Sequence, residues 1–154
     1  MTERHRPERV MIPPQEGVPM CFACGQQNPH GMKLRFWMEG HNTIGTEYTP
    51  PDYMMGWGNV LHGGFSALIL DEVMSYVPFA LLGVKAFVTR DISVRYRKPT
   101  FVGRKLIAHG HLIDDDGRKL TLKGEIKDEA GNLLTTAECT IVRVHEKHLE
   151  PGKG

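Results

Sequence analysis

The residues best suited to chemistry lie in one glycine-rich segment and in the apolar stretch that follows it. The segment reads Leu61-His62-Gly63-Gly64-Phe65, and Asp71 comes nine residues after His62. Glycine lets a substrate approach the backbone closely, and the free N–H groups that begin a helix can bind a developing oxyanion. A carboxylate among apolar residues costs free energy unless it is paired or used. Asp71 is therefore a candidate general base or nucleophile.

Asp71 also has a purely structural explanation. It could be a buried acid bonded to a hydroxyl group, with His62 doing no more than beginning the helix. Glu72 is the competing acid, and it lies about 100° around a helix from Asp71. The two acids therefore cannot face one small site.

Hydrophobic periodicity predicts the elements that must position these residues. Alternating apolar side chains predict strands over 32–38 and 43–49. From about residue 65 the apolar positions cover nearly the whole circumference of a helix, which predicts a buried helix that ends near Gly83. The period of two returns at about residue 86, and strand patterns follow near 103–113, 118–127 and 133–144.

This order of elements predicts an α+β fold, an antiparallel sheet of about six strands around one long central helix. In the strand after the helix, alternation puts Val88, Ile92, Val94 and Tyr96 on one face and Thr89 on the opposite, polar face. Exposed sheet edges favour pairing between subunits, so we expect at least a dimer.

A chain of 154 residues suffices for one domain. Residues 1–20 are charged and then rich in proline, which predicts a flexible arm, and 145–154 read as a polar tail.

A net charge of +1 does not favour a nucleic-acid partner. No run of about 18 apolar residues exists, so we expect no transmembrane helix and no membrane partner. Three cysteines and a start unlike an export signal favour the cytoplasm.

The pair Cys21-x-x-Cys24 has three interpretations. It could be half of a zinc site, with His30 as a further ligand, or a redox pair, or a tight turn that caps the first strand. A structural zinc site normally has four ligands and no second cysteine pair exists, so we expect the turn and no metal. His109 and His111 share one face of a strand and are expected on the polar outer surface.

Two motifs together identify a family. One is His62-Gly63-Gly64 with the acid Asp71, and the other is Cys21-Phe-Ala-Cys24-Gly25…Asn28-Pro29-His30-Gly31-Met32. On these motifs the sequence resembles the hotdog-fold acyl-CoA thioesterases, in the branch typified by the phenylacetate-pathway thioesterases. The resemblance covers residues 21–144 and implies a hotdog domain that assembles as a homodimer or a dimer of dimers.

The resemblance also implies roles for particular residues. The catalytic acid falls on Asp71 and the oxyanion donor on the Gly63 N–H, while His62 shapes the loop or touches the thioester. A hydroxyl that reaches across the dimer falls on Thr89, and some relatives use one that falls on Ser75. Several relatives have an asparagine where this chain has Gly56; Asn59 lies nearby.

The implied substrate is an acyl-CoA, and coenzyme A enters as part of the substrate, so no separate cofactor is expected. Its phosphates need a basic cluster, for which Arg95, Arg97 and Lys98 are candidates, although such a run can also be an ordinary solvated strand face. The other candidate substrate-binding residues are Gly64, Asn59, Phe65 and Leu68. The alternatives are a non-catalytic acyl-CoA-binding or regulatory module and a hotdog hydratase or dehydratase.

Overall fold

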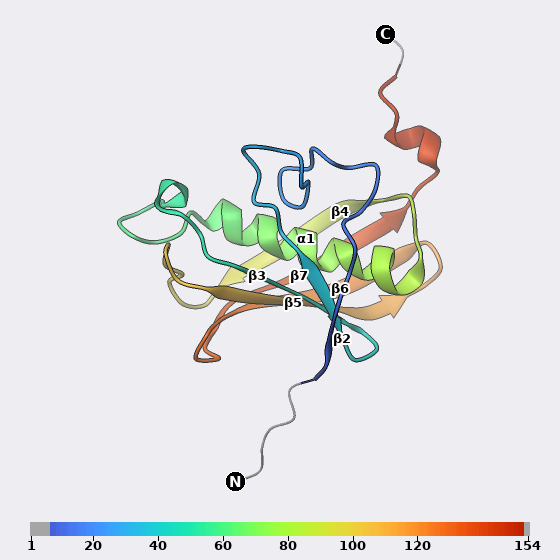
Figure 1. Ribbon diagram of the computed structural model, residues 1–154. Helices are drawn as coiled ribbons and strands as arrows, with labels where there is room; N and C mark the ends of the chain where they lie inside the picture. The colour runs from blue at the N-terminus through green and yellow to red at the C-terminus, as the bar shows by residue number, and fades with distance from the viewer. Residues whose placement is uncertain (1–6, 153–154) are drawn as a thin grey trace.

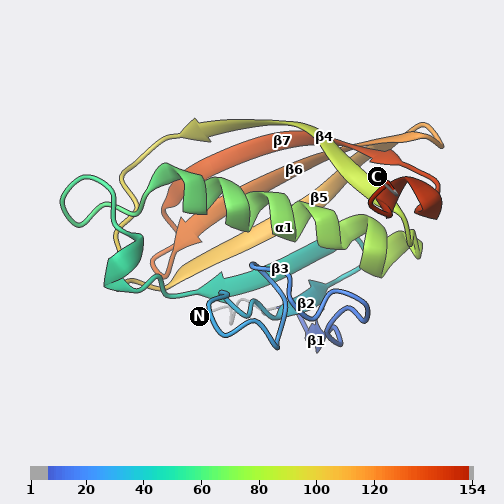
Figure 2. The ribbon, with the colours of Figure 1, turned by 90° about the horizontal axis from the view of Figure 1, so that it is seen from above.

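The computed structural model describes residues 7–152, in which one long helix lies across one antiparallel sheet (Figures 1 and 2). The sheet has seven strands within these residues. The strands are β1 (Arg9–Met11), β2 (Phe36–Glu39), β3 (Thr43–Tyr48), β4 (Phe87–Tyr96), β5 (Leu106–Asp115), β6 (Lys119–Asp128) and β7 (Leu133–Arg143). The helix is α1 (Gly63–Leu82), and two short 3₁₀ helices are η1 (Asp52–Met54) and η2 (Glu146–Leu149).

The strand order β1-β2-β3-β5-β6-β7-β4 places the strand that follows the helix at one edge of the sheet. β4 pairs only with β7 among the described strands, antiparallel, with Val94 opposite Ala137. Figure 2 shows α1 crossing the middle of the sheet with β4 on one side and β1 to β3 on the other. The outer edge of β4 therefore presents unpaired backbone groups, which favours pairing with another chain.

Helix α1 is buried because its apolar side chains pack against the sheet. Leu70, Val73 and Met74 are fully buried in one core with residues of the central strands such as Leu122 and Ile141. The helix continues through Pro78 and ends where Gly83 adopts a left-handed φ of 63°, as the sequence predicted. By length and composition α1 is also apolar enough to cross a membrane, a test that the core helix of a folded domain passes as well.

A β-bulge in β4 reverses the predicted faces of Val88 and Thr89, which precede it. The register of β4 against β7 shifts between Thr89 and Asp91, and the extra residue reverses the alternation before that point. Thr89 consequently faces helix α1, where its hydroxyl contacts the helix, and not the polar side. Val88, on the other face, is 41% exposed.

The N-terminal half differs from prediction in two respects. Arg9–Met11 forms edge strand β1 inside the range expected to be a flexible arm; residues 1–6 of that range lie outside the described residues, as do 153–154 of the predicted tail. The first predicted strand is regular only from Phe36, because Lys33 has a φ of 53°. Trp37, predicted on the polar side, is buried since the Arg9 guanidinium stacks over it at 4.1 Å.

Candidate active site

The glycine-rich segment forms the N-terminus of α1, as the sequence predicted. His62 is the N-cap residue, and its Nδ1 accepts a hydrogen bond of 3.0 Å from the Gly64 N–H. The N–H of Gly63, the first helical residue, donates to no partner within residues 7–152. This N–H is therefore free to donate to a ligand and carries the positive end of the helix dipole.

Tyr96 of β4 fixes the position of Gly63, a role that sequence reasoning missed. The Tyr96 hydroxyl donates a hydrogen bond of 2.6 Å to the Gly63 carbonyl. A Cβ at Gly63 would lie 3.0 Å from the phenol ring, so only glycine fits without displacement. The sequence did place Tyr96 on the apolar face of its strand. Because that face turns toward the helix, this placement could have indicated a contact between Tyr96 and the helix start.

A cavity of about 670 Å³ opens beside this helix start. It is lined by the segment Val60–Gly64 and, from the opposite side, by residues that follow β4, including Arg97 and Lys98. The structure thus brings two of the three candidate phosphate-binding residues to the same cavity as His62, Gly63 and Gly64. Arg95 lines a different cavity on the outer face of the sheet, which Arg97 also borders.

Asp71 lies in the middle of α1 and is half-buried. The Thr89 hydroxyl donates a hydrogen bond of 2.8 Å to Asp71 Oδ1. Thr89 belongs to the same chain as Asp71, whereas the family resemblance implied a hydroxyl that reaches across a dimer. The bulge in β4 explains the contact, because it turns Thr89 toward its own helix.

Asp71 and Glu72 point to different partners, as the helical angle between them requires. Asp71 contacts β4, while Glu72 contacts the loop that precedes β2, where the Cys21 thiol lies 3.8 Å from Glu72 Oε1. Burial raises the pKa of the Glu72 carboxyl above its ordinary value, and the neighbouring charge of Asp71 adds to the rise.

The remaining candidates lie around α1 and its preceding loop. Ser75 is half-buried one turn after Asp71, and Phe65 and Leu68 pack partly buried against the core. The exposed Asn59 accepts a backbone hydrogen bond from Val102 at its carbonyl. None of these four residues lines the cavity at the helix start.

One set of potential metal ligands is present within the described residues, formed by Cys21, Cys24 and Glu72. Their ligand atoms lie within 4.8 Å of one another. His30, which the sequence suggested as a ligand, is exposed and lies outside this set.

Comparison with known proteins shows which family the chain belongs to. The family described as Thioesterase superfamily matches residues 58–135, a segment that contains the helix start, Asp71 and Thr89. The chain therefore belongs to the thioesterase superfamily.

Solved structures agree with this family and confirm the predicted hotdog fold. Protein RHA08564, a thioesterase superfamily protein, is 28% identical with a TM-score of 0.73, over 80% of this chain and 60% of that chain. The PaaI protein from the phenylacetic acid degradation operon of E. coli is 15% identical with a TM-score of 0.68, over 74% of this chain and 81% of its own. The protein smu.793 from Streptococcus mutans UA159, bound to acetyl CoA, is 15% identical with a TM-score of 0.66. The match covers 72% of this chain and 88% of smu.793.

The chain thus spans 60% of the length of RHA08564. No protein with curated annotation matches the sequence. The neighbours linked to phenylacetic acid degradation share the fold of this chain, and the assignment to their branch stays a prediction.

Proposed function

We propose that this protein is an acyl-CoA thioesterase that hydrolyses a thioester to a free acid and coenzyme A. The observation that carries the proposal is a half-buried carboxylate, Asp71, held by the Thr89 hydroxyl in a helix whose first N–H group is free. Membership of the thioesterase superfamily supports it, as does the acetyl CoA bound to the structural neighbour smu.793.

The proposed chemistry uses the Asp71 carboxylate and the Gly63 N–H. Asp71 takes a proton from a water molecule, and the resulting hydroxide attacks the thioester carbonyl. Because Thr89 occupies Oδ1, Oδ2 is the oxygen left to accept this proton. The carbonyl oxygen becomes an oxyanion that the Gly63 N–H stabilises. The C–S bond then breaks, and the thiolate of coenzyme A leaves and takes the proton that Asp71 had accepted, which restores the carboxylate.

Within one chain these two groups lie far apart along the helix axis. Asp71 is the eighth residue after Gly63, and a helical rise of 1.5 Å per residue puts about 12 Å between their positions along the axis. A reacting carbonyl must lie within about 3 Å of both its donor and its attacking water. We therefore propose a homodimer in which the helix N-terminus of one subunit approaches Asp71 of the other.

The exposed surface near the helix start fits this assembly. Edge strand β4 carries the exposed side chains of Ile92 and Tyr96, and Phe101 follows it. Trp57 is 90% exposed in the loop before α1. A second chain that covers these apolar groups would remove them from water.

The basic residues at the cavity give coenzyme A a binding surface. Arg97 and Lys98 border the same cavity as Gly63 and Gly64, and both are exposed. Guanidinium and ammonium groups bind phosphate oxygens through charge-assisted hydrogen bonds. The phosphates of coenzyme A would lie here, with the thioester at the helix start.

A panel of acyl-CoA substrates tests the proposal. Release of free thiol is measured for short, long and aromatic acyl groups, and binding of each ligand is measured in parallel by calorimetry. The proposal expects enzyme-dependent thiol release from at least one acyl class. Binding of acyl-CoA with no thiol release from any would contradict it and favour a non-catalytic binding module.

A further inference from the structure

We propose that Cys21, Cys24 and Glu72 form a binding site for a divalent transition-metal ion, with zinc as the ion that their chemistry suits best. The two thiols come from the loop before β2 and the carboxylate from helix α1. This loop lies on the helix side of the sheet, next to α1 (Figures 1 and 2).

The loop holds both thiols on the same side of a tight turn. The Cys24 N–H donates to the Cys21 sulfur at 3.5 Å, and the Gly25 N–H donates to the Cys21 carbonyl at 2.8 Å. A Cβ at Gly25 would lie 2.5 Å from both the Cys21 nitrogen and the Pro19 carbonyl oxygen. Glycine is therefore required for this turn.

Glu72 completes the set from a distant part of the chain. Its carboxylate and the two sulfur atoms lie within 4.8 Å of one another, close enough for one ion to contact all three after small movements. Within residues 7–152, no lysine, arginine or histidine forms an ion pair with Glu72. A half-buried carboxylate beside two thiols lacks a positive charge, and a bound cation would supply one.

The ligand types select the ion. Two thiolates and one carboxylate are a donor set that zinc accepts, whereas magnesium and calcium prefer oxygen ligands alone. Three protein ligands leave a fourth position for water in a tetrahedral site. The ion would join the loop to α1 at the residue next to Asp71, while Asp71 itself faces β4. The site is thus an anchor for the helix, separate from the reacting carbonyl.

Cobalt titration tests the site without any dependence on enzymatic activity. The reduced full-length protein, handled without oxygen, is titrated with Co²⁺ and followed by absorption spectroscopy. We expect one equivalent to bind, with the near-ultraviolet charge-transfer band of a thiolate ligand and the visible bands of a tetrahedral ion. Zinc should displace the cobalt and raise the melting temperature.

Three variants locate the ligands. Cys24→Ser and Glu72→Gln should each weaken Co²⁺ binding at least about tenfold. The matched control is Cys139→Ala, which removes the remaining cysteine, a buried thiol whose pKa burial raises to about 12; it should bind Co²⁺ as the unmodified protein does.

Two results would overturn the proposal. One is the absence of the charge-transfer band in the reduced unmodified protein, which needs no variant to fold. The other is unchanged Co²⁺ affinity in Glu72→Gln, which would mean that the carboxylate is not a ligand.

Discussion

The Thr89 hydroxyl donates a 2.8 Å hydrogen bond to Asp71 Oδ1 and so joins edge strand β4 to the middle of helix α1. The bond depends on the bulge between Thr89 and Asp91, which turns the hydroxyl toward the helix. It fixes the orientation of the carboxylate and leaves its second oxygen for a water molecule.

Loss of this hydroxyl should slow turnover. A hydrogen bond to a charged group contributes about 1.5–3 kcal/mol, so Thr89→Val should lower kcat by roughly 10- to 100-fold. Thr89→Ser keeps the hydroxyl and should stay close to the unmodified rate. Steady-state thiol release measures both, and equal losses in the two variants would mean that the hydroxyl is not what matters.

The bond from Tyr96 to the Gly63 carbonyl positions the proposed oxyanion donor. Tyr96→Phe removes this bond and keeps the ring that packs on Gly63. A neutral hydrogen bond contributes about 0.5–1.5 kcal/mol, so kcat/KM should fall by about two- to tenfold with little change in melting temperature. An unchanged kcat/KM would show that the Gly63 N–H is held in place without Tyr96.

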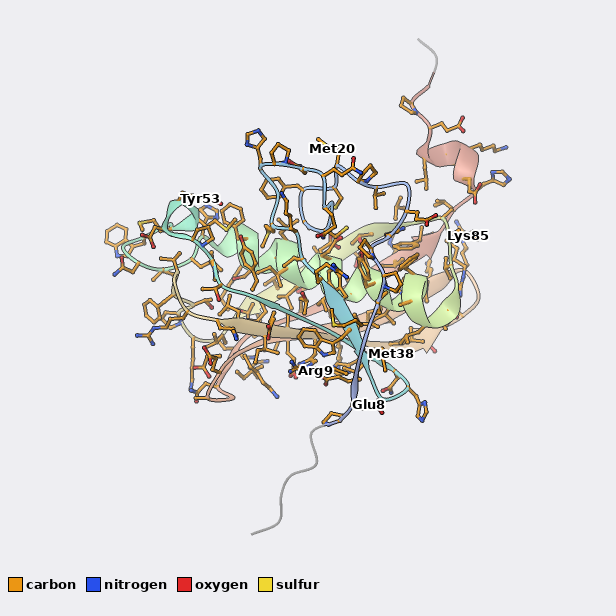
Figure 3. All side chains as sticks on the ribbon, viewed as in Figure 1. Glu8, Arg9, Met20, Met38, Tyr53 and Lys85 are labelled. Carbon is orange, nitrogen blue, oxygen red and sulfur yellow. The ribbon has the colours of Figure 1, made fainter. Side chains whose placement is uncertain are left out.

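Lys98 should contribute to binding of coenzyme A and not to chemistry. Lys98→Ala is expected to raise KM several-fold, to leave kcat unchanged and to reduce the dependence of KM on salt. Lys85→Ala is the matched control, because Lys85 lies at the other end of α1, as Figure 3 shows by the positions of Lys85 and Tyr53. If the Lys98 and Lys85 variants had similar KM values, the phosphates of coenzyme A would not bind at Lys98.

Mixed dimers test whether two chains share each active site. Asp71→Asn and Gly63→Ala are prepared separately and then allowed to exchange subunits. If Asp71 and Gly63 act from different subunits, each mixed dimer has one intact site, and random exchange should restore about a quarter of the unmodified activity. Activity that stays at the level of the separate variants would indicate that each chain uses its own pair.

The periodicity of the sequence predicted helix α1, its end at Gly83 and the strands from β3 onward. These predictions succeeded because α1 is apolar around nearly its whole circumference and because buried side chains alternate along most of the central strands. Strand β1 was missed because three exposed residues leave no such pattern. The burial of Trp37 was not predicted, because the Arg9 side chain that covers it comes from another strand.

Motif spacing placed Gly63 at the helix start and Asp71 in the helix interior, where the structure has them. The orientation of Thr89 was not predictable, since a single extra residue in β4 reverses the alternation and leaves no mark in the composition. The partnership of Cys21 and Cys24 with Glu72 was equally hidden, because about fifty residues separate the loop from the helix and only the fold brings them together.

The rate of thiol release by Asp71→Asn, on the best substrate of the panel, tests the central claim most directly. Asparagine can still accept the Thr89 hydrogen bond, so the fold should persist, and Asp52→Asn serves as a control at an exposed acid before α1. Because the general base is lost, the rate of thiol release by Asp71→Asn should fall by about 10²- to 10⁴-fold. The rate of Asp52→Asn should stay near that of the unmodified protein. Hydrolysis by Asp71→Asn at a rate close to that of Asp52→Asn would contradict the role of Asp71.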